Sequence, residues 1–77
     1  MRILKYKTYL REEPEGGYTV FFPSLPGCIT YGKDIKEALA MAKEVVERHI
    51  LCLKEHGEEI PSDAGMLEYD TFVEDHA

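Results

Sequence analysis

Two histidines and one cysteine come closest to a metal site in this sequence. His49, Cys52 and His56 would lie on consecutive turns of a helix, because residues three or four apart are neighbours on a helix surface. From His49 to His56, however, a helix rises about 10 Å at 1.5 Å per residue, whereas zinc–nitrogen bonds are only about 2.1 Å long. Only adjacent pairs could therefore bind one ion. We expect no metal site, and we interpret His49 as a hydrogen-bonded histidine of the apolar helix face.

The candidate nucleophiles are Ser24, Cys28 and Cys52. Nucleophilic catalysis needs such a side chain beside a base that a third group orients. Cys28 follows Gly27 at the start of an expected strand, and that segment contains no histidine. Because cysteine commonly behaves as a small buried hydrophobic residue, we predict that Cys28 is buried. The sequence indicates no catalytic residue.

The acidic residues do not follow the pattern of a metal-dependent nuclease. That chemistry needs carboxylates that converge on one or two divalent ions. The expected strands instead carry Lys5, Lys7 and Thr19, while the acids occupy the loop at 12–15, the outer helix face and the tail. We therefore expect a binding protein that is not an enzyme and needs no cofactor. The alternatives are a divalent-metal nuclease and a homo-oligomeric module that binds a small ligand.

Length and charge restrict the class of protein further. The 77 residues carry a formal net charge of −6, which disfavours direct binding to nucleic acid, since such binding relies on Lys and Arg. No apolar run approaches the roughly 20 residues of a membrane-spanning helix, and the N-terminus does not resemble a signal peptide. Two cysteines fit neither a disulfide framework nor a four-ligand zinc site, so we expect a cytoplasmic protein with no membrane contact. A core this small is marginal in stability, which favours a homodimer or a higher homo-oligomer.

Alternation of apolar and polar residues predicts the strands. Residues 2–11 read as a strand with one buried face, and residues 12–17 contain a Pro and two Gly, which favour a hairpin turn. Residues 18–22 read as a central strand that Pro23 ends, because proline lacks the amide needed for a sheet ladder. Residues 28–31 read as a third strand.

A helix is predicted over residues 34–56. Asp34 and Glu37 have the spacing of a capping box, and Gly57 can adopt the left-handed conformation that ends a helix. The apolar residues fall on one arc of a helical wheel, which predicts that this arc packs on the sheet. The arc comprises Ile35, Ala38, Leu39, Ala42, Val45, Val46, His49, Ile50 and Leu53.

The tail is less regular than the rest of the chain. Residues 66–73 could form a fourth strand with Leu67, Tyr69, Thr71 and Val73 on one side. The expected fold is α+β, a three- to four-stranded antiparallel sheet with one long amphipathic helix on one face, in the order β-β-β-α-β. We expect one domain over residues 1–77, with a core at 2–61 and a tail at 62–77.

The order of these signals resembles the HicB-like antitoxin family over roughly residues 3–61. The resemblance depends on a strand, the motif Pro-x-Leu-Pro-Gly-Cys at 23–28, a second strand ending at Gly32 and a helix that starts at Asp34. Pro23 and Pro26 stiffen the connection between the strands, and Gly27 permits a tight turn. The remaining matching residues are Glu37, Ala38, Leu39, Ala42, Gly57, Ile60 and Pro61.

The resemblance implies a fold similar to a truncated ribonuclease H sheet and assembly into homodimers or larger oligomers. It also implies a partner, a small, basic, RNA-cleaving HicA-like toxin that the antitoxin would neutralise by covering its active site. Longer members carry a C-terminal helix-turn-helix or ribbon-helix-helix segment that binds operator DNA. Residues 62–77 contain no basic recognition helix, so we expect no direct DNA binding by this segment.

Three carboxylates on the outer helix face are the predicted partner contacts. Glu37, Glu44 and Glu47 point outward on the helical wheel. Outward carboxylates could pair with Lys, Arg or an active-site His of a toxin. We therefore predict that these three residues bind the partner.

Overall fold

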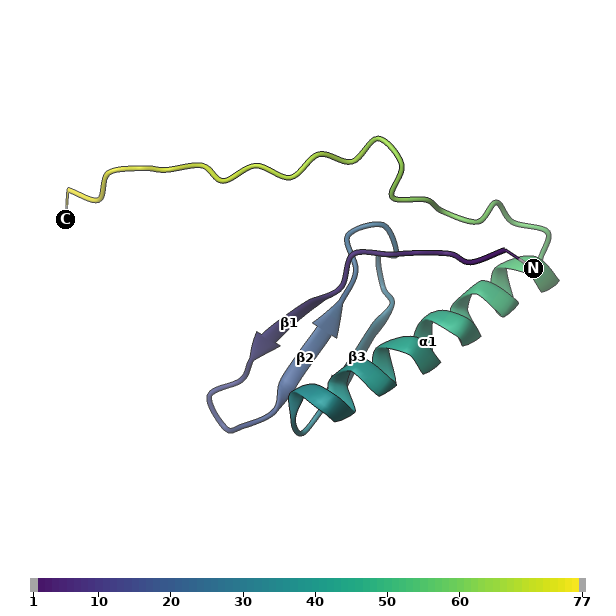
Figure 1. Cartoon of the computed structure of the whole chain (residues 1–77), viewed down its shortest axis with the longest axis horizontal. Coiled ribbons are helices and arrows are strands. Elements are labelled where there is room, and N and C mark those ends of the chain that lie inside the picture. The colour runs from purple at the N-terminus through teal and green to yellow at the C-terminus, as the bar shows by residue number, and fades with distance from the viewer. Residues whose placement is uncertain (1, 77) are drawn as a thin grey trace.

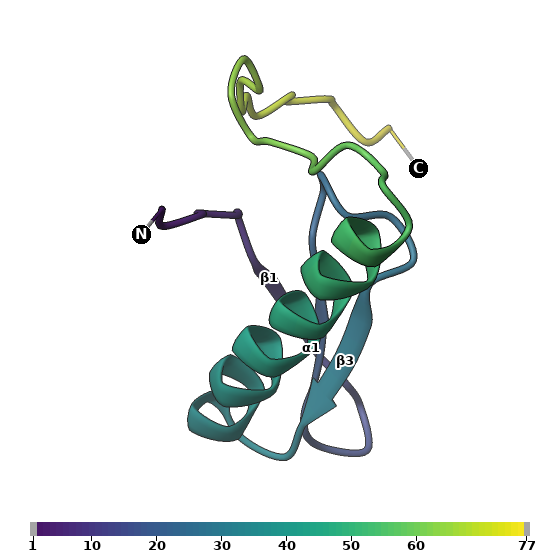
Figure 2. The ribbon, with the colours of Figure 1, turned by 90° about the vertical axis from the view of Figure 1, so that its right-hand side faces the viewer.

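One antiparallel sheet and one long helix form the regular structure of residues 2–76, which the computed structural model describes. The strands follow the order β1-β2-β3 in the sheet, and α1 lies across one of its faces (Figure 1 and Figure 2). This arrangement confirms the predicted α+β class. The elements are β1 (Tyr9–Glu12), β2 (Tyr18–Phe21), β3 (Ile29–Gly32) and α1 (Ile35–Glu55).

The two connections within the sheet form for the reasons that the sequence indicates. In the β1–β2 hairpin, the Gly16 amide donates to Glu13 O and the Glu13 amide donates to Gly17 O, both at 2.9 Å. Between β2 and β3, the Cys28 amide donates to Leu25 O at 3.0 Å. Gly27 has a φ of +85° in this turn, a conformation that glycine adopts without a Cβ penalty. The turn brings the side chains of Leu25 and Cys28 into the core.

Both ends of α1 are capped. Asp34 Oδ1 accepts from the Glu37 amide at 2.8 Å, and Glu37 Oε1 accepts in return from the Lys33 amide at 3.0 Å. This is the predicted capping box, with the return bond one residue earlier than in the usual motif. At the other end, Gly57 has a φ of +65°. The Glu58 amide donates to Leu53 O at 2.9 Å, so α1 ends in a Schellman motif.

The core lies between α1 and the sheet face that carries Val20. Val20 and Ala38 have no exposed surface, and Leu25 is 1% exposed. Phe22 and Cys28 complete the strand side of this cluster. The helix crosses so close to β3 that Gly32 faces Ala38 with no room for a side chain. The predicted helix arc is only partly covered, since Ile35 and Leu39 remain more than half exposed.

The prediction of a strand over residues 2–11 is wrong for residues 2–8, because β1 begins at Tyr9. Pairing explains the difference. Tyr9 pairs with Phe21, so the same register would place Lys7 opposite Pro23, which has no amide to donate. The Lys7 amide donates instead to Asp63 Oδ2 at 2.5 Å. Residues 2–8 therefore lead into β1 as an extended segment that is not part of the sheet ladder.

No fourth strand forms over residues 66–73 in the described chain. The tail leaves α1, crosses the end of the sheet and then runs away from the body as an extended segment (Figure 1). The reason lies in its first part. Asp63 is held at the end of the sheet by Lys7 and by Ser24, so the following residues are directed past the free edge of β1 and not along it.

Candidate protein-binding site

The three predicted partner contacts do not form one cluster. The Glu37 carboxylate serves the N-terminal cap of α1. Glu44 Oε1 accepts from Arg48 Nη2 at 2.6 Å, with both side chains more than half exposed. At 100° per residue, Glu44 lies about 20° from Glu37 around the helix axis and Glu47 about 80° away. Glu37 and Glu44 therefore share one side of α1, while Glu47 lines a groove on another.

The outer face of the sheet carries an exposed aromatic and aliphatic surface that the sequence analysis missed. Across the strands, Tyr9 pairs with Phe21 and Phe21 pairs with Ile29. The Tyr9 and Phe21 rings stack with centroids 5.6 Å apart, and the Arg11 guanidinium lies 6.0 Å from the centroid of Phe21. Ile29 is 60% exposed and Tyr31 is 50% exposed. The available signal was the presence of large apolar residues at both odd and even positions of the strands.

A groove lies on the other face, between the extended segment 2–8 and α1. Its volume is about 730 Å³. The segment contributes its even-numbered residues, which continue the inward face of β1. On the helix, the groove follows the part of the apolar arc that the sheet leaves uncovered. The lining residues are Arg2, Leu4, Tyr6, Thr8, Phe22, Leu39, Ala42, Lys43, Val46, Glu47, Ile50, Leu51 and Lys54.

The candidate chemical groups of the helix are separated or used in structural contacts. His56 Nδ1 lies 2.8 Å from Cys52 O, within the last turn of α1, and 3.7 Å from Cys52 Sγ. His49 is partly buried. Within residues 2–76, no three or more His, Cys, Asp or Glu side chains converge in a way that could hold a metal ion.

The prediction that Cys28 is buried is confirmed. Its side chain is 4% exposed, and its Sγ lies 4.0 Å from Val45 O. Burial raises the pKa of the Cys28 thiol, which disfavours the nucleophilic thiolate form. Ser24 donates instead to Asp63 of the tail.

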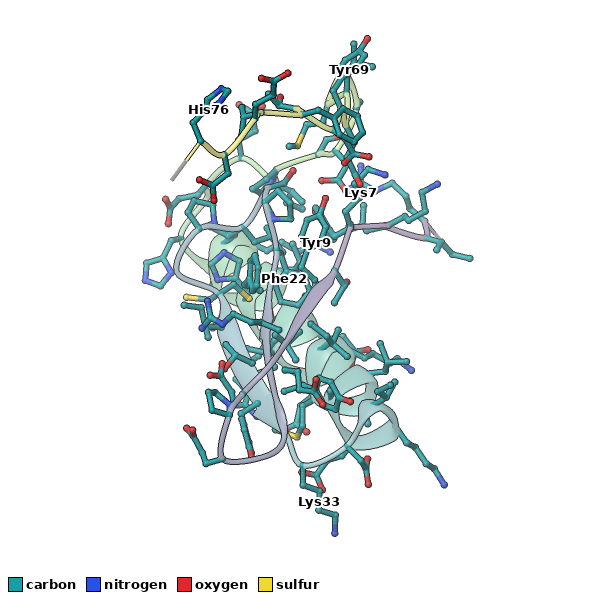
Figure 3. All side chains as sticks on the ribbon, turned by 90° about the vertical axis from the view of Figure 1, so that its left-hand side faces the viewer. Lys7, Tyr9, Phe22, Lys33, Tyr69 and His76 are labelled. Atoms are coloured by element: carbon teal, nitrogen blue, oxygen red, sulfur yellow. The ribbon has the colours of Figure 1, made fainter. Side chains whose placement is uncertain are left out.

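Polar contacts hold the first half of the tail to the end of the sheet. The Tyr6 hydroxyl donates to Pro61 O at 2.6 Å, and the Tyr9 hydroxyl donates to Glu68 Oε1 at 2.9 Å. Asp63 accepts from the Ser24 hydroxyl and from the Lys7 amide, and these two hydrogen bonds, the first having the larger effect, lower the pKa of its carboxyl. Figure 3 shows Lys7 on the segment beside the tail and Tyr69 on the tail itself, away from the helix.

Comparison with known sequences identifies the protein family of this chain. Residues 6–76 match the family described as the HicB_like antitoxin of bacterial toxin-antitoxin systems. The chain belongs to the HicB-like antitoxin family. The resemblance inferred from residues 3–61 is thereby confirmed, and the match extends further, into the tail that the structure leaves extended.

Individual relatives of this HicB-like chain differ in length. A UPF0150 protein of Thermoplasma acidophilum is 45% identical over 60 residues, which cover 78% of this chain and 87% of that protein. Antitoxin HicB of Escherichia coli K12 is 32% identical over 71 residues, which cover 92% of this chain and 51% of that protein. A UPF0150 protein of Synechocystis is 32% identical over 62 residues, covering 80% of this chain and 78% of that protein. The chain thus spans most of these two UPF0150 proteins and about half of antitoxin HicB.

The described residues also bear on membrane association. No helix within residues 2–76 combines the length and the apolar character that crossing a membrane requires. The apolar surfaces of this HicB-like chain, namely the outer sheet face and the groove, are confined to a part of each element. Such patches mark sites that bind proteins, membranes or small ligands.

Proposed function

We propose that this chain is a noncatalytic antitoxin-type protein that neutralises a small HicA-type toxin ribonuclease by direct protein–protein contact. The observation that carries the proposal is the alignment with antitoxin HicB of Escherichia coli, which covers 92% of this chain. The aligned region contains the sheet, the helix and most of the tail. We therefore assign the toxin-binding role to this domain and not to a separate DNA-binding segment.

Charge supports this assignment. The chain carries a net charge of −6, and the resemblance implies a basic toxin. Complementary charge accelerates encounter and orients the partners, with a smaller effect on affinity itself. The carboxylates on α1 are solvent-exposed or partly exposed, so they are accessible to a basic partner.

Glu37, Glu44 and Glu47 are the contacts that we assign to the toxin. Glu44 is the most informative of the three. The side chain of its partner Arg48 is 73% exposed. An exposed ion pair of this kind is weak, so an Arg or Lys of the toxin could take the place of Arg48 beside Glu44 with little loss of free energy. Glu37 is less suited to a test, because its substitution would also remove a cap of α1.

Co-expression provides the first test. The chain should relieve the growth defect caused by the HicA-type protein encoded in the same genome, and the two proteins should co-purify as a complex. If neither rescue nor a complex is found with any such protein of that genome, the antitoxin assignment is wrong. Purified chain that cleaves RNA in the presence of magnesium or manganese would instead support the nuclease alternative.

A pair of matched variants then tests the contact surface. Glu44→Gln should weaken toxin binding by roughly 1.4- to 5-fold, the range for one exposed ion pair, mainly through a slower association rate that depends less on salt. Glu58→Gln makes the same change in net charge at an exposed position beyond the end of α1 and should leave the rate nearly unchanged. Equal effects of the two variants would show that only the overall charge matters and would remove Glu44 from the contact.

A further inference from the structure

The groove between residues 2–8 and α1 has an apolar floor that the described chain covers only in part, since Phe22 and Ile50 are buried while other lining residues are exposed. Six large apolar side chains line it. Among them Leu39 is 53% exposed and Leu51 is 58% exposed. Exposed apolar surface of this kind on a small domain indicates a binding site. The six side chains are Leu4, Phe22, Leu39, Val46, Ile50 and Leu51.

The end of the tail has exposed apolar side chains, and no surface of the described chain buries them. We define the distal tail as residues 69–76. Tyr69, Phe72 and Val73 are 82%, 92% and 84% exposed, and the segment is extended. Aromatic and β-branched residues favour strands that are half buried. The distal tail therefore has the composition of a strand that lacks its sheet.

Charge makes the groove and the distal tail complementary. Although the whole chain has a net charge of −6, the charged side chains that line the groove are the cations Arg2, Lys43 and Lys54 with a single carboxylate, Glu47. The distal tail carries three carboxylates and no Lys or Arg. A local basic rim on an acidic protein selects an acidic apolar segment. The three carboxylates are Asp70, Glu74 and Asp75.

From these observations we propose that the groove binds the distal tail of a second copy of this chain, so that two copies exchange their tails reciprocally. The occupant would lie beside residues 2–8, whose free edge no ladder uses, as an added strand. Its apolar side chains would cover the groove floor and its carboxylates would meet the basic rim. The same pair of surfaces acts twice, as a two-fold symmetric interface requires.

The direction of the tail explains why a second copy is the occupant. Asp63 and Glu68 hold the preceding residues at the end of the sheet, and the distal tail continues away from the body (Figure 1 and Figure 2). To enter the groove of its own chain it would have to reverse sharply. Of the residues that favour such reversals, residues 66–76 contain no Gly, Pro, Asn or Ser and only the two aspartates Asp70 and Asp75. Exchange between copies fills the groove without a turn.

The oligomeric mass of the full chain tests this proposal. Sedimentation equilibrium should give twice the chain mass of 8.8 kDa. Because a reciprocal dimer buries Phe72 twice, Phe72→Ser should raise the dimer dissociation constant about a hundredfold to ten-thousandfold, the range that corresponds to burial of two large apolar side chains. Ile29→Ser is the matched control, because Ile29 is also exposed but lies on the outer sheet face, and it should leave the constant unchanged.

Cross-linking tests which tail enters the groove. Two variants are made in a Cys52→Ser background, one with Phe72→Cys in the tail and one with Leu39→Cys in the groove. When mixed and oxidised, they should form a disulfide-linked heterodimer. A chain that carries both substitutions and closes an intramolecular disulfide as a monomer would place the tail in its own groove and overturn the proposal. A monomeric wild-type chain at every concentration, or a dimer that Ile29→Ser dissociates and Phe72→Ser does not, would also overturn it.

Discussion

Gly32 is the position where this fold has no spare volume. Its φ is not positive, so the constraint is space and not backbone conformation. A Cβ at Gly32 would lie 2.3 Å from Ala38 N, 2.4 Å from Ala38 Cα and 2.9 Å from Ala38 Cβ. The two shortest distances involve backbone atoms of α1, which cannot rotate away as a side chain can. Gly32→Ala therefore requires the helix to move away from β3.

The expected cost is large for one methyl group. Overpacking a well-packed core costs about 1–3 kcal/mol, and we expect Gly32→Ala to reach about 3 kcal/mol because the obstacle is backbone. For a domain of 60–100 residues, each kcal/mol lowers Tm by roughly 4–8 °C, so the variant should melt roughly 12–24 °C below the wild-type chain. Since a domain of this length is stable by only about 4–12 kcal/mol, a substantial part of its stability would be lost.

Thermal and urea unfolding followed by circular dichroism measure this loss, with two further variants as references. Gly57→Ala introduces a Cβ that meets nothing within 4 Å, although φ is +65°, and should cost only about 1 kcal/mol. Ala38→Gly removes the Cβ but leaves the two nearest backbone atoms in place. The double variant Gly32→Ala/Ala38→Gly should therefore be no more stable than Gly32→Ala. A Gly32→Ala chain within about 0.5 kcal/mol of wild type, or one that Ala38→Gly restores, would refute the packing argument.

Two further predictions concern a buried thiol and a tail carboxylate. Cys52 is exposed and Cys28 is buried with a raised pKa, so one thiol should react rapidly with a disulfide reagent and the second only on unfolding; Cys52→Ser should abolish the rapid phase. The pKa of Asp63 is lowered in the folded chain by its hydrogen bonds to Ser24 and the Lys7 amide. A lowered pKa stabilises the attached tail above the ordinary aspartate pKa of about 3.9 and loses this effect as the pH falls through the lower folded value. The Lys7 amide resonance should titrate in that acidic range, and Asp63→Asn should remove the transition.

The sequence predicted the helix and the turns well because their signals are local. Asp34 and Glu37 mark the start of α1, Gly57 marks its end, and each side chain or conformation acts within a few residues of its own position. The capping box and the Schellman motif need no knowledge of distant segments. The same is true of Gly27, whose turn depends on its own φ.

The length of β1 could not be predicted in the same way, because it depends on pairing. Alternation in residues 2–11 indicates a strand regardless of what lies beside it. The ladder stops where Lys7 would meet Pro23, and this encounter follows only from the register that pairs Tyr9 with Phe21. Residues 2–11 and 18–23 each show a regular pattern, and the conflict between Lys7 and Pro23 appears only when the two segments are paired.

The candidate surfaces were hidden for a related reason. Phe21 and Ile29 are apolar and would be assigned to a core by composition, yet one helix covers only one face of the sheet, so they stay exposed on the other. Leu39 lies within the predicted buried arc of α1 but borders the uncovered groove. The width of the apolar arc of α1 can be determined from the sequence. How much of this arc is buried depends on the number of elements that pack against it.

Although the net charge of this chain is negative, its surface has both an acidic and a basic region. The two regions suit different partners, a toxin and a second copy of the chain. The side of α1 with Glu44 suits a basic partner, whereas the groove has a rim that includes Lys43 and Lys54, which would repel one. The two proposed sites meet at Glu47, which is assigned to the toxin and also lines the groove. Glu44 does not line the groove, so the toxin contact of Glu44 and the tail contact of Phe72 should be separable. Glu44→Gln should weaken toxin binding and leave the oligomeric mass unchanged, while Phe72→Ser should lower the mass and leave toxin affinity within about twofold, as expected for two residues that share no contact. A loss of toxin binding on Phe72→Ser would mean instead that the toxin recognises the assembled dimer.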